Sequence, residues 1–320
     1  MRIIFAGSGD FAEPALRSLL GAGHHIALVI TQPDKPAGRG RKLVPTPVRQ
    51  TAEERGLEVM ATPNVNASEV LTRVAEANAQ VAVVAAFGQK LGPELLQSIP
   101  GGWINIHASL LPAYRGAAPI HRAILDQCFE TGVTVFRLVE RMDAGPILVT
   151  RRTAIKPEET TEELHDRLAA IGCDAIKAAL DLYAKGTPEG TPQDESQATY
   201  ARKLRKENGR IDFTRPAEVE AAHVNGMWSW PGATCQYVSA ATGKSETVTL
   251  VRARPAEAAG QPLPPGTLDD RLHVATGQGF LELLEIKPQG GRRMPWPDFV
   301  NGRHVQPADR FSGRLAPSEA

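Results

Sequence analysis

An asparagine and a histidine stand two residues apart in a short apolar segment, and this spacing could bring both side chains to one site. The segment, residues 103–107, reads WINIH and predicts a strand. Because successive side chains of a strand point to opposite faces, Trp103, Asn105 and His107 share one face. An amide can donate to an oxyanion, and an imidazole exchanges protons near neutral pH. The pair could also be a hydrogen-bonded couple that only supports the fold.

A carboxylate follows the next predicted strand, residues 132–138, after a short loop. It is Asp143, and glycine and proline come soon after it in the segment MDAGPI. Such a residue is often part of a turn. It would also suit an acid held beside the histidine of a neighbouring strand, where it would favour the imidazolium and fix the orientation of the ring. The spacing leaves both interpretations open.

The N-terminal segment contains a glycine pattern that is typical of dinucleotide-binding proteins. Residues 7–12 read GSGDFA, directly after a predicted strand and before a predicted helix, and match G-x-G-x-x-A. Two features weigh against a dinucleotide. The acidic residue Asp34 comes only after Pro33, beyond the end of the second strand, and Pro14 removes a backbone donor from the first turn of the helix. We therefore favour a tight strand-to-helix turn that needs small residues.

The elements that would position these residues alternate between strand and helix in the first half of the chain. Strands are predicted at residues 2–6, 26–31, 81–86, 103–107 and 132–138, and helices at residues 11–20, 46–55, 67–77 and 93–97. This rhythm indicates an α/β, Rossmann-like fold, an open and mostly parallel sheet with helices on both faces. The sites of such sheets lie beyond the carboxyl ends of the strands, where Asn105 and His107 are expected.

The second half of the chain has a different pattern. A long helix is predicted at residues 160–183, followed by a polar stretch that is rich in glycine and proline. Further on, short alternating segments predict a smaller β-rich domain, an antiparallel sheet or barrel. Two domains are expected for a chain of 320 residues. We place the first domain at residues 1–188, a linker at 189–206 and the second domain at 207–314.

The overall composition argues against several classes of protein. The 36 lysine and arginine residues balance 36 aspartate and glutamate residues, so any nucleic-acid contact must come from local basic patches. Cys128, Cys173 and Cys235 are far apart, which favours buried thiols in a reducing cytosol over disulfides or a zinc site. The N-terminus lacks the apolar run of a secretory signal, and no stretch approaches the ~20 apolar residues of a membrane span. We expect a cytoplasmic protein.

Several segments together resemble a known superfamily. SLLPAYRGAAPI at residues 109–120, preceded by Asn105 and His107 and followed by Asp143, is similar to the folate-dependent formyltransferases. The segments RIIFAGSGDFA, TQPDKPAGRGRKLVPTPV, TYARKLRKENGRIDF and WPGA narrow the resemblance to the methionyl-tRNA formyltransferase family. The resemblance covers nearly all of residues 1–314. It implies a one-carbon transferase that serves translation initiation.

The resemblance implies a formyl donor, 10-formyltetrahydrofolate, and no metal. In the implied acyl transfer, the α-amino group of methionine on initiator tRNA attacks the formyl carbon. Asn105 and a protonated His107 would donate hydrogen bonds to the formyl oxygen, and Asp143 would hold His107 in its charged form. The folate pocket of the family lies beside the strand that bears these residues. Transferred to this sequence, its lining comprises Ser109, Leu110, Leu111 and Pro112, with Phe87 and Gly88 as further walls.

The resemblance also implies a macromolecular partner, the methionyl-initiator tRNA. Two clusters of basic residues suit contact with its phosphates. They comprise Lys35, Arg39, Arg41 and Lys42 in a basic loop, and Arg205 and Lys206 near the start of the second domain. In the family, the second domain is a barrel related to the OB fold and contributes to the tRNA surface. A monomer without an obligate protein partner or membrane contact is the expectation.

Four interpretations remain, of which formyl transfer to tRNA is favoured. A formyltransferase for a sugar or nucleotide, or a formyl-folate hydrolase, would use the same three catalytic residues, but neither accounts for the basic loop and the second domain. An oxidoreductase would bind a dinucleotide at the glycine-rich turn. A tRNA-binding protein without activity would have no use for Asn105, His107 and Asp143.

Overall fold

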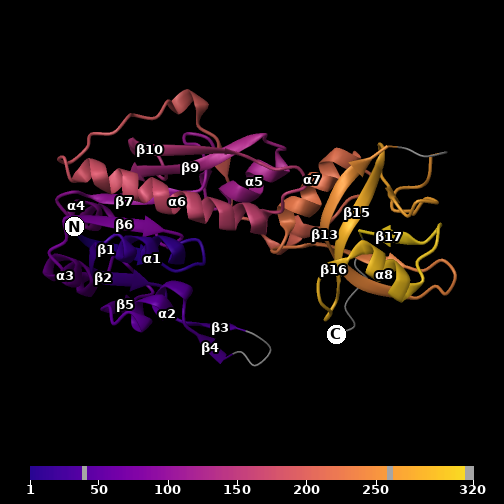
Figure 1. Ribbon diagram of the computed structural model, residues 1–320, viewed down its shortest axis with the longest axis horizontal. Coiled ribbons are helices and arrows are strands. Elements are labelled where there is room, and N and C mark those ends of the chain that lie inside the picture. The colour runs from indigo at the N-terminus through magenta and orange to yellow at the C-terminus, as the bar shows by residue number, and fades with distance from the viewer. Residues whose placement is uncertain (38–41, 258–261, 314–320) are drawn as a thin grey trace. The chain divides into compact units, whose positions relative to one another are not determined.

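The computed structural model describes residues 1–37, 42–257 and 262–313, which form two compact units (Figure 1). The first unit comprises residues 1–119, 130–154 and 165–201. The second unit comprises residues 120–129, residues 155–164 and the described residues from 202 onward. Each unit is built on its own sheet.

The first unit contains a seven-stranded sheet in the order β10-β9-β7-β6-β1-β2-β5. Its strands are β1 (Arg2–Gly7), β2 (His25–Thr31), β5 (Val59–Ala61), β6 (Val81–Ala85), β7 (Trp103–His107), β9 (Glu130–Arg137) and β10 (Ile147–Ala154). The strands from β7 to β5 pair in parallel, whereas β9 and β10 run antiparallel to their neighbours. The sheet is therefore Rossmann-like and mostly parallel, which confirms the fold predicted from the sequence.

Helices cover both faces of this sheet. The helices of the first unit are α1 (Glu13–Gly21), α2 (Pro47–Glu54), α3 (Ser68–Glu76), α4 (Pro93–Gln97) and the greater part of α6 (Thr161–Tyr183). Val70 of α3 and Leu95 of α4 pack with Trp103 of β7 in one core cluster. On the opposite face, a Cβ placed on Gly172 of α6 would lie 3.1 Å from Ile106. Each fully buried side chain of this kind contributes about 1.5–3 kcal/mol.

The direction of β9 decides where the loop after it begins. Arg137, at the end of β9, pairs with Ile104, near the start of β7, so the chain leaves β9 at the end of β7 that lies away from His107. The loop then returns over the sheet, because Leu138 packs against the core cluster and Asp143 comes back to His107. The sequence predicts the strand but not its direction, and therefore not this path.

The segment after α6 stays with the first unit as far as residue 201. Thr191 and Ile147 exchange two backbone hydrogen bonds of 2.8 Å. Strand β11 (Tyr200–Ala201) pairs in parallel with β8 (Arg115–Gly116). Much of the stretch predicted as a linker, residues 189–206, thus follows the surface of the first unit closely.

The second unit is a nearly closed antiparallel barrel. Its sheet has the order β14-β15-β13-β12-β17, with β16 paired to β15. The strands are β12 (Ala233–Val238), β13 (Ser245–Ala256), β14 (Val274–Ala275), β15 (Phe280–Pro288), β16 (Met294–Pro295) and β17 (Arg310–Ser312). Thr267 bridges to Arg310 of β17 and Leu268 to Val274 of β14, so this segment connects the two edges. Residues 267 and 268 form only these two isolated bridges and belong to none of the named strands.

Three helices belong largely to the second unit. They are α5 (Pro119–Leu125), α7 (Ala217–Met227) and α8 (Trp296–Arg303). The sequence pattern predicts neither α5 nor α8. Both missed helices are short, with seven and eight residues, and a segment of that length shows little helical periodicity.

The three cysteines and the lengths of the helices test what the composition indicates about disulfides and membrane spans. Cys235 is buried, Cys128 and Cys173 are half-buried, and all three are free thiols. Complete burial raises the pKa of Cys235 far above its ordinary value, so this thiol is unreactive. Across the described ranges, no helix combines the length and the apolar character that a bilayer crossing needs.

Candidate active site

His107 ends β7, and two loops hold its ring. Its side chain is only 7% exposed. Nε2 lies 2.9 Å from the carbonyl oxygen of Tyr114, and because a carbonyl oxygen can only accept, Nε2 carries the proton in this contact. The ring packs edge-on against Phe136 of β9, with 6.3 Å between the centroids. Nδ1 is therefore the nitrogen left for chemistry.

Asp143 lies in the loop after β9, with its backbone in the left-handed region at a φ of 51°. Its Oδ2 accepts a hydrogen bond of 2.7 Å from the backbone N–H of Gly116. The same oxygen is 3.9 Å from Nδ1 of His107, which is an ion-pair distance but too long for a hydrogen bond. The structure thus brings the carboxylate of this loop to the imidazole at the end of β7.

Asn105 precedes His107 by two positions on β7, so both side chains project from the same face of the sheet. Its side chain is half-buried and lies on the strand beside Phe136 of β9. Within the described part of the chain, no residue forms a hydrogen bond with the Asn105 amide. The amide is free to donate to a bound group.

The SLLP segment forms the turn after β7. Ser109 is 1% exposed, and its hydroxyl donates to the carbonyl oxygen of Ala113 at 2.6 Å. Leu111 is also buried, and its N–H donates to the hydroxyl of Thr134 at 3.1 Å. Leu110 and Pro112 are partly exposed. The two buried side chains hold the turn in place, and the other two remain accessible.

Phe87 and Gly88 follow β6 and fix the course of the next loop. The Phe87 side chain is buried in the core cluster, and its carbonyl oxygen accepts a hydrogen bond of 2.7 Å from the side-chain amide of Gln32. Gly88 has a φ of 76°, and a Cβ there would come within 2.5 Å of the same amide. Glycine is therefore required at position 88.

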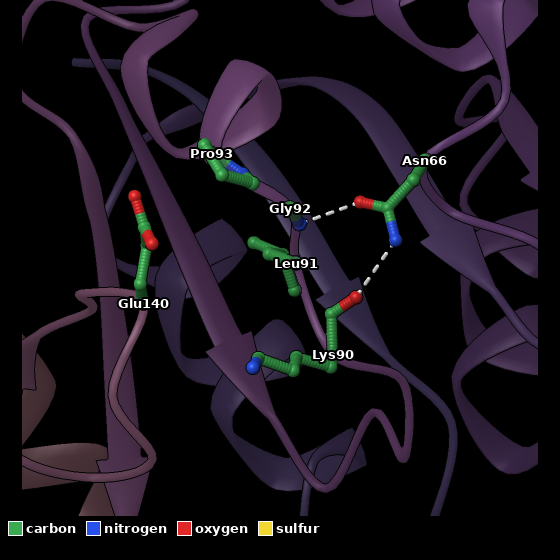
Figure 2. Close-up of a pocket in the computed structure, with 6 residues that line it drawn as sticks. All are labelled: Asn66, Lys90, Leu91, Gly92, Pro93 and Glu140. Carbon is green, nitrogen blue, oxygen red and sulfur yellow. Dashed lines mark hydrogen bonds between the residues drawn. The ribbon is translucent and has the colours of Figure 1, made fainter.

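A pocket of about 300 Å³ lies beyond this loop (Figure 2). It is lined by Asn66, Lys90, Leu91, Gly92, Pro93 and Glu140. Asn66 holds the loop from one side, accepting from the N–H of Gly92 at 2.6 Å and donating to the carbonyl oxygen of Lys90 at 2.9 Å. Figure 2 shows Glu140 on the other side, three residues before Asp143 in the chain. The pocket therefore borders the loop that carries the acid.

The basic residues near position 40 lie on a hairpin that the sequence analysis treats only as a loop. Strand β3 (Lys35–Ala37) pairs with β4 (Lys42–Val44) in antiparallel fashion. Lys35 is exposed, with Nζ 2.6 Å from Oε1 of Gln32. Arg39 and Arg41 lie outside the described residues, as does the side chain of Lys42.

The second basic cluster is exposed at the start of the second unit. Arg205 and Lys206 stand at the beginning of the short 3-10 helix η2 (Lys206–Gly209). Arg205 is 3.8 Å from Glu207 in an exposed ion pair, which contributes little to stability. Both side chains are exposed.

The glycine-rich turn after β1 has a structural explanation. A Cβ on Gly7 would come within 2.8 Å of both Ala12 and Phe5, whereas the nearest atom to a Cβ on Gly9 is 3.7 Å away. The hydroxyl of Ser8 accepts from the N–H of Gln32 at 3.0 Å, which ties the turn to the end of β2. Close packing of strand against helix accounts for the first glycine without a bound nucleotide.

The residues that support the acid and the imidazole were missed by the sequence analysis. Arg115 has no exposed surface, and its guanidinium binds the side chains of Gln193 and Glu195. The hydrogen bond from Arg115 holds the pKa of Glu195 below its ordinary value. Glycine and proline around Gln193 and Glu195 favour a linker, and the sequence contains no pattern that pairs position 115 with position 193.

Among the described residues, no group of histidine, cysteine and acidic side chains could hold a metal ion.

Comparisons with known proteins support one family over the whole chain. The sequence pattern of the formyl transferase family matches residues 1–180, and that of the formyl transferase C-terminal domain matches residues 203–304. A methionyl-tRNA formyltransferase of Heliobacterium modesticaldum is 40% identical over 323 residues, with 97% of this chain and 100% of that protein covered. One of Methylococcus capsulatus is 42% identical over 304 residues, with 94% and 96% covered.

A solved structure shares the fold. HypX from Aquifex aeolicus, in complex with tetrahydrofolic acid, aligns with a TM-score of 0.61 at 18% identity over 96% of this chain. The chain spans about half of that protein, 48% of its length. Identity this low shows the fold alone, whereas the two curated relatives match from end to end. The chain belongs to the methionyl-tRNA formyltransferase family.

Proposed function

We propose that this chain transfers the formyl group of 10-formyltetrahydrofolate to the α-amino group of methionine on initiator tRNA, in the cytoplasm, for translation initiation. The observation that carries the proposal is the meeting of Asn105, His107 and Asp143 at the end of β7 in a chain of this family. Relatives about 40% identical over nearly their full length are named for this acceptor. The solved relative with tetrahydrofolic acid supports a folate donor. The enzyme acts as a monomer and needs no metal.

The two units suit different tasks, catalysis and tRNA binding. We assign residues 1–188 to catalysis, 189–206 to a connecting segment and 207–314 to tRNA binding. The two family patterns, which end at residue 180 and begin at residue 203, support this assignment. The structural boundary between residues 201 and 202 falls inside the proposed connecting segment.

The chemistry is acyl transfer through a tetrahedral intermediate. The neutral amine attacks the formyl carbon, a carbon–nitrogen bond forms, and negative charge develops on the formyl oxygen. The Asn105 amide and the Nδ1–H of a protonated His107 donate hydrogen bonds to that oxygen. The bond between the carbon and N10 of the folate then breaks. Each donor of this kind contributes a factor of ~10²–10³ to kcat.

Asp143 keeps the charges in balance during this sequence. Its Oδ2, 3.9 Å from Nδ1, stabilises the imidazolium, while the Tyr114 carbonyl holds Nε2. The amine releases one proton as the intermediate collapses, and N10 takes up one, so the enzyme ends in the state in which it began. No covalent intermediate is needed, and the buried hydroxyl of Ser109 already donates within its own turn.

The donor occupies the space between the SLLP turn and the pocket of Figure 2. Leu110 and Pro112 offer accessible apolar surface to the pterin, and the buried Ser109 and Leu111 support that surface from behind. Phe87 and Gly88 fix the loop that leads into the pocket. The folate tail ends in glutamate carboxylates, for which the exposed ammonium of Lys90 is the matching charge.

The acceptor is held by local basic clusters, since the net charge of the chain is zero. Lys35, Arg39, Arg41 and Lys42 contact phosphates of the tRNA acceptor end, and Arg205 and Lys206 contact other phosphates of the same tRNA. Such contacts release counterions, so binding weakens as salt increases.

The test is formyl transfer by the purified protein from 10-formyltetrahydrofolate to methionyl-initiator tRNA. Methionyl-elongator tRNA and a mixture without acceptor serve as controls. Formylation of the initiator alone supports the proposal. Release of formate without tRNA would identify a formyl-folate hydrolase, and transfer only to an amino sugar nucleotide would identify a small-molecule formyltransferase.

A further inference from the structure

The segment of residues 191–201 lies against the loop that carries the proposed acid and against the turn that follows the strand of the imidazole. Thr191 pairs with Ile147 at the end of the acid's loop. Tyr200 and Ala201 pair with Arg115 and Gly116, directly after the turn that holds the imidazole. Most polar side chains between these two anchors are exposed, but those of Gln193, Glu195 and Thr199 form hydrogen bonds with residues 114, 115, 143 and 145.

Gln193 holds the backbone on either side of Asp143. Its Nε2 donates to the carbonyl oxygen of Asp143 at 2.8 Å and to that of Gly145 at 2.7 Å. Asp143 has a left-handed backbone, which is unfavourable for a non-glycine residue and persists only when neighbouring groups enforce it. The two hydrogen bonds from Gln193 provide that enforcement.

A buried arginine fixes which way the Gln193 amide points. Oε1 of Gln193 accepts from Nε and Nη2 of Arg115 at 3.1 and 2.7 Å. Arg115 is fully buried, and Glu195 accepts two more of its hydrogen bonds at 2.9 and 3.0 Å. Because a guanidinium only donates, the amide oxygen must face Arg115 and the amide nitrogen must face the two carbonyls. A flipped amide would satisfy neither side.

Thr199 supports the other member of the pair. Its hydroxyl accepts from the N–H of Tyr114 at 2.8 Å, and the carbonyl oxygen of Tyr114 accepts from Nε2 of His107. Tyr114 also has a left-handed backbone, at a φ of 60°. The position of His107 is thus linked through one residue to Thr199.

We infer that Gln193 and Thr199 are positioning residues, which set the 3.9 Å approach of the Asp143 carboxylate to His107. The inference rests on the proposed function, because it assigns these residues to the formyl-transfer site. Neither side chain reaches the reacting atoms. Both act on peptide groups beside the acid and the imidazole, and misplacement of a catalytic group by about 1 Å lowers turnover by up to ~10²-fold.

The sharpest test is Gln193→Glu in the full-length enzyme. This change keeps the side-chain length and the acceptors for Arg115, and it replaces the amide that donates to the Asp143 loop with a carboxylate oxygen that repels the same two carbonyl oxygens. The matched control is Gln197→Glu, in the same segment, where the exposed amide binds only Asp194. We expect Gln193→Glu to lower kcat at least 10-fold with both KM values within about twofold of wild type. Gln197→Glu should match wild type.

A second measurement separates positioning from a general loss of stability. If Gln193 acts through the Asp143 carboxylate, Gln193→Glu should cost less than twofold in single-turnover rate when Asp143→Asn is already present. If the double variant instead loses the product of the two single-variant losses in rate, the positioning role is overturned. Should Gln193→Glu fail to fold, Thr199→Val tests the support of His107 instead: kcat should fall with both KM values within about twofold of wild type, and Thr199→Ser should restore the hydroxyl and the rate.

The outcomes distinguish this inference from the proposed function. Wild-type turnover in both Gln193→Glu and Thr199→Val, in an enzyme that formylates methionyl-tRNA, would overturn the inference alone. A wild-type enzyme that formylates no acceptor would overturn the proposed function and the inference with it.

Discussion

The two nitrogens of His107 are not equivalent, and this fixes how the residue can act. The Tyr114 carbonyl oxygen accepts a hydrogen bond from Nε2–H, so only Nδ1 faces Asp143. The free amide of Asn105 lies on the same side of the strand as His107. A ring held at one nitrogen loses little orientational freedom when it donates with the other. This preorganisation is what an oxyanion site requires, since the donors must be in place before the charge develops.

Lys90 gives a residue-scale prediction about the donor. Lys90→Gln should raise the KM for 10-formyltetrahydrofolate several-fold, by about 1 kcal/mol, because an exposed ammonium contributes that much to an ion pair. The KM for tRNA and kcat should not change. Steady-state kinetics with each substrate varied in turn measures all three values. Lys185→Gln, at another exposed lysine of the first unit, is the control; an equal effect of both changes would contradict the placement of the folate tail.

At the scale of one element, close packing at a single glycine determines the course of the β1–α1 turn. At the β1–α1 turn, Gly7 lets the strand pass within contact of Ala12, while a Cβ on Gly9 would make only an ordinary contact, 3.7 Å from Ala86. Gly7→Ala should therefore lower the free energy of unfolding by roughly 1–3 kcal/mol, as overpacking does. Gly9→Ala should change it by less than about 0.5 kcal/mol. Urea unfolding measures both, and equal destabilisation would show that the turn has another requirement.

Two buried ionisable residues of helix α7, Glu220 and His223, determine how the stability of the second unit depends on pH. Burial raises the pKa of Glu220 to about 7, and the approach of Arg215, 3.3 Å away, only partly opposes this. Burial lowers the pKa of His223 to about 4. The contribution of Glu220 to the free energy of unfolding is lost as pH rises from 4.5 to 7. The contribution of His223 is lost as pH falls from 6.5 to 4. Two opposing shifts of similar size leave wild-type stability nearly flat over this range.

Glu220→Gln removes one side of this balance. At pH 8 the variant should exceed wild type by up to about 3 kcal/mol, since an isosteric amide has no charge to desolvate, and the gain should vanish near pH 4.5. Tryptophan fluorescence during urea unfolding follows this unit, which holds Trp228, Trp230 and Trp296. A variant less stable than wild type at pH 8 would show instead that the ion pair with Arg215 outweighs burial.

Local patterns account for most of the first unit and for the Asn105–His107 strand. The segment WINIH is apolar at every other position and forms β7 at the predicted residues. The long helix ends at Tyr183 as predicted, because glycine and proline follow. The direction of β9, and therefore the path that carries Asp143 back, depends on pairing between distant segments. The contact of Gln193 with Asp143 spans 50 residues, and no local periodicity reports such a distance.

At the scale of the whole molecule, zero net charge coexists with basic clusters, so tRNA binding must depend on few residues. Arg41→Ala with Lys42→Ala should raise the KM for tRNA and flatten its dependence on salt by about one unit of slope per lost phosphate contact. The KM for the folate donor should stay constant. Arg55→Ala, at an exposed arginine that follows α2, is the control. An unchanged KM for tRNA would point to a small-molecule acceptor.

The most direct test of the account is the single-turnover rate of formyl transfer to methionyl-initiator tRNA by Asn105→Ala and His107→Ala, with both substrates saturating. The account predicts that each variant folds like wild type and loses at least ~10²–10³ in rate, because each has lost one donor to the formyl oxygen. Near-normal rates in both variants would contradict it, since the oxygen would then be stabilised by residues other than those at the end of β7.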